Sequence, residues 1–182
     1  MTQFRPVVFL AALFIVGGPL TASPQTEQTR IPEPDNASAI RDGGFLGKLA
    51  GEWILSRKIG GKMAENKATA NWVLNNQFLQ LHMIDAASPP QYEAVVLIGY
   101  DESTKEYVAH WADTFGAQYA AIGRGRLAND SIEFKFTYPD GPFFNTFSWH
   151  ASDGTWTSYM ENVMPDGSRG FFAEDVYHRP GQ

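Results

Sequence analysis

The sequence predicts an all-β protein, an antiparallel up-and-down barrel of about ten strands with a short N-terminal helix. Apolar and polar residues alternate with a period of two from Glu52 almost to the C-terminus, as they do in half-buried strands. Clusters of glycine, proline, asparagine and aspartate separate these segments and are typical of tight turns. Strands in such a meander avoid exposed edges by closing into a barrel, and an open sandwich is the alternative architecture.

The elements are expected in the following order. A short helix over Phe45–Leu49 follows two glycines and would plug one end of the barrel. The segments with strand periodicity are Glu52–Ile59, Glu65–Leu74, Phe78–Asp85, Tyr92–Tyr100, Glu106–Asp113, Gln118–Leu127, Ser131–Tyr138, Phe143–His150, Thr155–Met164 and Gly170–Arg179.

Alternation also predicts which side chains face the barrel interior. The apolar members of three strands are expected there: Ile132, Phe134, Phe136 and Tyr138; Tyr92, Ala94, Val96 and Ile98; and the small residues Ala121, Gly123 and Gly125. Small inner residues opposite large ones either pack a core or leave room for a ligand. The sequence leaves this choice open, because both faces of Phe78–Asp85 and Thr155–Met164 are apolar enough to be inner.

The N-terminal residues predict export. Residues 1–22 combine one arginine, an apolar run and small residues at Thr21-Ala22-Ser23, the pattern of a cleavable signal peptide. An uncleaved membrane anchor is the alternative, but the apolar run is short for a membrane span. Residues 23–36 are rich in proline, glutamine and threonine and are expected to form a disordered linker. Residues 37–182 would then be the barrel domain of a periplasmic or secreted protein.

Composition excludes several classes of function. The net charge of −6 and the absence of a long basic run argue against nucleic acid as a partner. The chain has no cysteine, which removes disulfides, thiolate catalysis and a lipid-modified cysteine that could anchor the mature protein. The four histidines have no metal-binding spacing, and no serine lies in a nucleophile motif. The sequence therefore favours a binding protein over an enzyme and predicts no metal.

Four short motifs carry a family resemblance: Gly51-x-Trp53 on the first strand, Ile98-Gly99-Tyr100-Asp101, His110-Trp111-x-Asp113 and the closing Tyr177-x-Arg179. Together they resemble a bacterial calycin-like (lipocalin-like) domain family of unknown function, related to lipocalins, fatty-acid-binding proteins and nitrobindins. The resemblance implies that Trp53 shuts one end of the barrel and that the guanidinium of Arg179 lies over its ring. The nitrobindins also imply haem as an alternative cofactor, although no cofactor is predicted from the residues themselves.

Candidate ligand-binding residues are polar or aromatic members of the strands that could face inward. His82 and His110 lie in mid-strand among apolar neighbours. Asp113 closes a strand, where capping a turn is its alternative role. Glu161 would be desolvated if it faced inward, and a solvated outer position is its alternative. The full candidate set is Trp72, His82, His110, Trp111, Asp113, Tyr119, Phe136, Met160 and Glu161.

The leading interpretation is a barrel that binds a small apolar or amphipathic ligand in its interior. Three alternatives remain at this point. They are haem bound through one histidine, an enzyme that uses Asp113 or Glu161 as a base with His110, and a packed barrel that acts as an interaction module. The sequence determines neither the ligand nor the oligomeric state.

Overall fold

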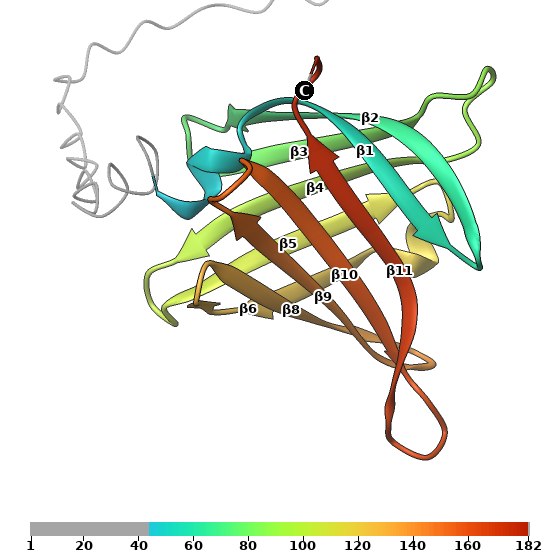
Figure 1. The fold of residues 1–182 in the computed structure, drawn as a ribbon. Helices are drawn as coiled ribbons and strands as arrows, with labels where there is room; N and C mark the ends of the chain where they lie inside the picture. Colours follow the sequence, from blue (N-terminus) through green and yellow to red (C-terminus); the bar gives the residue numbers. More distant parts are fainter. Residues whose placement is uncertain (1–43, 182) are drawn as a thin grey trace, which may run out of the picture. The chain divides into compact units, whose positions relative to one another are not determined.

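A computed structural model describes residues 44–181. The predicted signal peptide and linker, residues 1–22 and 23–36, lie outside the described residues. The regular secondary structure of the described chain is almost entirely strand (Figure 1). Its elements are η1 (Phe45–Leu49), β1 (Gly51–Ile59), β2 (Lys62–Val73), β3 (Phe78–Asp85), β4 (Glu93–Asp101), β5 (Glu106–Asp113), η2 (Ala117–Tyr119), β6 (Ala121–Gly125), β7 (Leu127–Ala128), β8 (Ser131–Tyr138), β9 (Gly141–His150), β10 (Thr155–Val163) and β11 (Arg169–His178).

The strands form a closed antiparallel barrel, as the sequence predicted. Each strand from β1 to β6 pairs with the next, β8 to β11 do the same, and β1 pairs with β11. The barrel closes between β6 and β8, where Arg124 lies opposite Lys135. The two-residue β7 continues alongside β8, so ten strands make the wall and β7 is an appendage. Within residues 44–181, no helix is long and apolar enough to cross a membrane.

One predicted strand is shorter than expected. Gln118–Leu127 was predicted as a single strand, but its first residues belong to the 3-10 helix η2 and only Ala121–Gly125 forms β6. Gly116 precedes η2 with φ of 96°, a conformation that glycine adopts without steric cost and that turns the chain out of the sheet. Tyr119 therefore lies outside the sheet.

The barrel interior is filled at the end that carries η1. Alternation placed the inner face correctly in β4 and β8, where Ala94, Val96, Ile98, Ile132, Phe134 and Phe136 are at most 2% exposed. Gly123 also faces inward, and a Cβ added there would lie 2.6 Å from the ring of Phe136. The small residue of β6 therefore accommodates a large one of β8 at this level, which is close packing and not free space.

The closed end is built from η1, Trp53 and Arg179. Phe45, Leu46 and Leu49 of η1 are buried in the core, and the indole of Trp53, 1% exposed, donates a hydrogen bond of 2.7 Å to the carbonyl of Leu49. The Arg179 guanidinium lies 3.6 Å from the centre of the Trp53 ring. It donates to the carbonyls of Lys48, Ala50 and Glu52. The predicted stacking of Arg179 on Trp53 is confirmed.

Candidate functional site

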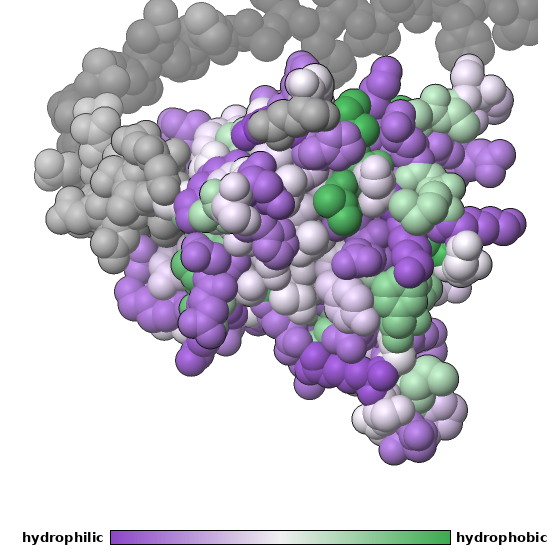
Figure 2. All heavy atoms as spheres, viewed as in Figure 1, coloured by the Kyte–Doolittle hydropathy of each residue, from purple (hydrophilic) through white to green (hydrophobic). Residues whose placement is uncertain are grey.

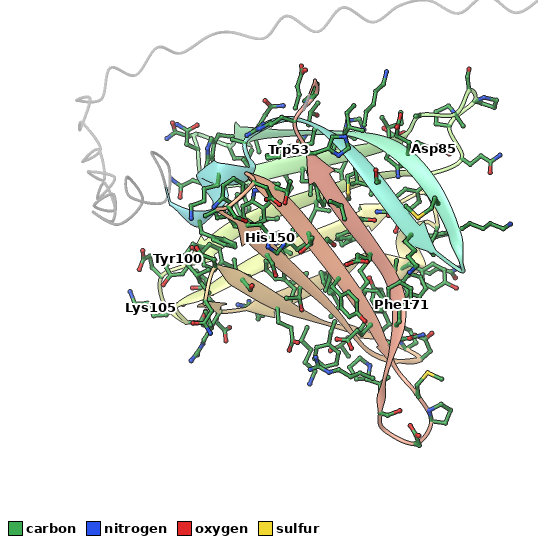
Figure 3. The ribbon with its side chains drawn as sticks, viewed as in Figure 1. Trp53, Asp85, Tyr100, Lys105, His150 and Phe171 are labelled. Carbon is green, nitrogen blue, oxygen red and sulfur yellow. The ribbon has the colours of Figure 1, made fainter. Side chains whose placement is uncertain are left out.

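The other end of the barrel, here called the mouth, contains charged and polar side chains on its inner face. It lies opposite η1, where β1 ends and β2 begins and where β10 ends and β11 begins. In Figure 3, Asp85 and Phe171 lie toward this end, whereas Tyr100 and Lys105 lie toward the end with η1. Any group that enters the barrel without displacing η1 and Trp53 must do so at the mouth.

The innermost polar group at the mouth is a buried ion pair. Arg57 of β1 faces inward because it shares the strand face of Trp53 and Leu55, and Asp175 lies opposite it on β11. The guanidinium donates from Nε to Oδ1 of Asp175 at 2.7 Å and from Nη2 to Oδ2 at 2.6 Å. Arg57 is 8% exposed and Asp175 is fully buried. Such a bidentate pair fixes the direction of both side chains.

Burial and pairing act on the pKa values of these two groups in different directions. Burial alone lowers the pKa of Arg57, but the hydrogen bonds and charge of Asp175 outweigh it and leave that pKa above its ordinary value. Burial raises the pKa of the Asp175 carboxyl, although the hydrogen bonds and charge of Arg57 act in the opposite direction. The carboxylate therefore depends on the guanidinium for its charged state.

A second set of polar groups continues from this ion pair toward the solvent. The Arg57 guanidinium carbon lies 4.7 Å from the centre of the Tyr92 ring. The Tyr92 hydroxyl donates to Oδ2 of Asp113 at 3.5 Å, and Nε1 of Trp111 donates to the same oxygen at 3.1 Å. The backbone N–H of Phe115 donates to the other oxygen, Oδ1. Asp113 is thus held by three donors, one of which belongs to the turn that it was predicted to cap.

Aromatic rings surround this polar set on both sides. Phe115 and Tyr119 are 65% and 45% exposed, and the Phe115 ring lies next to those of Tyr92 and Tyr119. On the other side, consecutive ring contacts with centroid distances of 5.3 to 6.4 Å join Trp111, Phe136, Tyr138, Phe143 and Phe172. Phe172 has no partner across β10, because the register shifts there and Glu161 pairs with Phe171. This bulge brings Phe172 to Phe143.

Two polar side chains near the ion pair are buried on the inner face of β2 and β9. Asn145 accepts a hydrogen bond of 2.7 Å from Ser158. Asn66, 2% exposed, has no hydrogen-bond partner for its Nδ2. A buried amide that lacks a partner costs roughly 1–3 kcal/mol, so Asn66 leaves a donor available at this level of the barrel.

Five of the predicted site residues face the interior, and one of them, Trp72, shares the inner face of β2 with Ala68 and Ala70. Trp111, Phe136 and Met160 are inner residues of β5, β8 and β10, and Phe136 and Met160 are 2% and 5% exposed. Asp113 ends β5 on the same face as Trp111 and receives its hydrogen bond. Tyr119 lies on η2, next to Phe115 at the rim of the mouth. The structure therefore brings Trp111, Asp113 and Tyr119 to the mouth.

The remaining predicted site residues do not lie at the mouth. The expected inward position of His82, His110 and Glu161 is wrong. His82 faces outward between the inner residues Leu81 and Met83 and contacts Glu93 at 2.6 Å. His110 is exposed on the outer face of β5. Glu161 follows inner Met160, so it faces outward and lies 3.5 Å from Arg169. Trp72 is half-buried at the end of β2 that adjoins the closed end.

These positions bear on the alternatives that rely on histidine. His82, His110, His150 and His178 all alternate with inner residues of their strands, so none of the four faces the interior. His110 and Asp113 lie on opposite faces of β5, so the proposed acid–base pair is not assembled. Within residues 44–181, no three histidine, aspartate or glutamate side chains group as metal ligands.

The candidate set did not include Tyr92 and Tyr138, although both were predicted to face inward, nor Arg57, Asn145 and Asp175. For Arg57 and Asp175 a further signal was present in the sequence. Asp175 is four residues before Arg179, which was expected to face inward, so a strand places both on the same face. The same spacing relates Arg57 to Trp53. A charged residue on a predicted inner face was the signal that could have identified the ion pair.

The position of Tyr92 leads to a prediction on pH. Burial raises its pKa from 10.0 to about 12, although the nearby Arg57 lowers it. When the pKa of a group is higher in the folded state than in the unfolded state, the group stabilises the fold at any pH below its unfolded pKa. This stabilisation is lost as the pH rises from the unfolded pKa to the folded pKa. As the pH rises from about 10 to about 12, the free energy of unfolding should therefore fall by up to roughly 2–3 kcal/mol through the titration of Tyr92.

Urea unfolding at about pH 9 and about pH 11.5 would measure this effect in the wild type and in Tyr92→Phe. The other tyrosines titrate in both proteins and cancel in the comparison. We expect the wild type to lose more stability than Tyr92→Phe as the pH rises. Equal losses would mean that the pKa of the Tyr92 phenol is not raised in the folded protein.

Comparison with known protein families gives one match. Residues 43–179, which include the whole barrel, match the family model described as "Protein of unknown function (DUF1579)". A search of curated proteins found none that matches the chain. The family match covers both the closed end and the mouth.

Proposed function

We propose that this chain, which belongs to the DUF1579 family of proteins of unknown function, binds a small amphipathic molecule at the mouth of its barrel. The observation that carries the proposal is the arrangement of polar and aromatic side chains on one inner face. Tyr92 and Asp113 offer polar contacts above the Arg57–Asp175 pair, and Tyr138 and Phe143 offer apolar surface beside them. Pockets that orient small molecules combine the same two features.

Packing supports the mouth rather than the deep interior as the place of binding. Leu79, Leu81 and Phe134 are at most 1% exposed and fill the barrel from the closed end to its middle. The rings of Trp111, Tyr138 and Phe143 are only partly buried, so they retain apolar surface that a ligand could cover. On the face viewed in Figure 2, hydrophobic side chains form small groups among hydrophilic ones.

The predicted signal peptide supports a setting for this function. If residues 1–22 direct export, the barrel would meet its ligand in the periplasm or outside the cell. No disulfide is needed there, because a chain of this length can bury a sufficient core. The proposal needs neither a metal nor a cofactor.

Titration with Nile red, an uncharged apolar dye, tests the proposal. We expect enhanced dye emission with a dissociation constant of about micromolar, which corresponds to roughly −8 kcal/mol. Tyr138→Ala should weaken binding about tenfold or more, because it removes a ring from the mouth. Tyr159→Ala is the matched control, since Tyr159 is a 39% exposed tyrosine on the outer face of β10. Equal affinities for the wild type and Tyr138→Ala, or no binding at all, would contradict the proposal.

A further inference from the structure

The charges at the mouth discriminate between classes of amphipathic ligand. We propose that the head group bound there is a cation of the alkylammonium type, held by Asp113 and the aromatic rings around it. This inference rests on the proposed function, since it names the ligand class of the same site. It concerns a small ammonium compound with a short apolar part, because the barrel beyond the mouth is filled.

Arg57 is not available to an anionic head group. Both of its hydrogen bonds to Asp175 are short, and its ring contact is with Tyr92. The N–H donors of Arg57 that do not bond Asp175 belong to a residue that is 8% exposed. A carboxylate ligand that took over the bidentate contact would displace Asp175, which is fully buried and would lose its cationic partner. Breaking a buried pair in this way is unfavourable, so the net charge that the pair presents to a ligand is zero.

Asp113 supplies a negative charge that is not compensated. Its oxygens accept hydrogen bonds from Trp111, Tyr92 and the backbone of Phe115, and all three donors are neutral. Within the part of the chain that the structure describes, no lysine, arginine or histidine lies within 4.0 Å of this carboxylate. The partly buried carboxylate thus attracts a cation from the solvent.

The rings around Asp113 are suited to the same charge. Tyr92 and Trp111 contact the carboxylate directly, Phe115 lies beside Tyr92, and Tyr119 lies beside Phe115; both of these outer rings are exposed. Aromatic faces attract ammonium groups electrostatically, and several rings around one carboxylate are a known arrangement for binding quaternary ammonium. The apolar part of the ligand would then lie along Tyr138, Phe143 and Phe172, which extend from the other side of Asp113.

Three probes with the same octyl chain test this inference: octyltrimethylammonium, octan-1-ol and octanoate. Isothermal titration calorimetry at low ionic strength should show the ammonium probe binding about tenfold more tightly than octanol, with octanoate weakest. Asp113→Asn keeps one accepting oxygen but removes the charge, so it should abolish this tenfold preference of the ammonium probe over octanol. Glu93→Gln is the matched control, since Glu93 is a carboxylate next to Tyr92 that faces outward and pairs with His82.

Each outcome separates this inference from the proposed function. Tighter binding of octanoate, or equal binding of all three probes, would overturn the cationic head group while the mouth remained a binding site. Loss of the preference in Glu93→Gln as well would attribute it to general surface charge, which also overturns the inference. If neither the three probes nor Nile red bound, the proposed function itself would fail.

Discussion

Replacing Trp53 with alanine is expected to lower the free energy of unfolding by about 3–5 kcal/mol. The indole is 1% exposed, donates to the Leu49 carbonyl and supports the Arg179 guanidinium from below. Its removal would leave a cavity between η1 and the first strand, which the rigid barrel wall cannot fill by relaxing. Urea unfolding measures the loss. Trp72→Ala is the control, a half-buried indole near the same end for which a smaller loss is expected.

Arg179 gives the same prediction a second test. Arg179→Ala should cost roughly 1–3 kcal/mol through the lost stacking and carbonyl contacts. Because the two side chains touch, the double variant should lose less than the two single losses together. Gly51 belongs to this arrangement, since its φ is 115° and an added Cβ would lie 2.5 Å from Nη1 of Arg179. Additive losses in the double variant would contradict a stacked pair.

Replacing Arg57 with methionine is expected to cost about 3–5 kcal/mol, because Asp175 would remain buried without its cation. Replacing both residues, in Arg57→Met/Asp175→Leu, should recover most of that loss, since apolar groups of similar volume often stabilise as well as a buried pair. Lys48→Met is the control. It breaks the exposed contact with Asp130 at 3.3 Å and should change the stability by less than about 1 kcal/mol.

The pH dependence of Arg57→Met distinguishes a buried charge from a simple packing defect. Burial already raises the pKa of Asp175, and without the guanidinium nothing opposes that effect. Because the pKa of Asp175 is then higher in the folded state than its unfolded pKa of about 4, the protonated carboxyl stabilises the fold below about pH 4. This stabilisation is lost as the pH rises above that value. The deficit of Arg57→Met relative to the wild type should therefore be smaller near pH 4 than near pH 7. A deficit independent of pH would indicate a packing defect alone.

The sequence by itself determined the strand order, most strand bounds and the closed end of the barrel. Phe78–Asp85, Glu106–Asp113 and Ser131–Tyr138 have the predicted bounds because their alternation is regular and turn residues flank them. The stacking of Arg179 on Trp53 also followed from the sequence, through a family resemblance carried by motifs on the first and the last strand.

The absolute orientation of a strand was harder to predict than its alternation. Alternation says that His82 and Leu81 face opposite sides, but not which of them faces inward, and β3 has apolar residues on both faces. Packing decides this: Leu79, Leu81 and Met83 fill the core, so His82 is left outside. An error of one residue inverts every side chain of a strand, so His82 on β3 and His110 on β5 were each predicted on the wrong face.

Only the tertiary structure decided the composition of the mouth. Arg57 and Asp175 are 118 residues apart, and their meeting depends on the pairing of β1 with β11 that closes one side of the barrel. Phe172 reaches Phe143 through a register shift that no local pattern reveals. Local periodicity therefore determined which residues could share a face of a strand. Long-range strand pairing determined which of them touch, because contacts across a sheet depend on the register between distant segments.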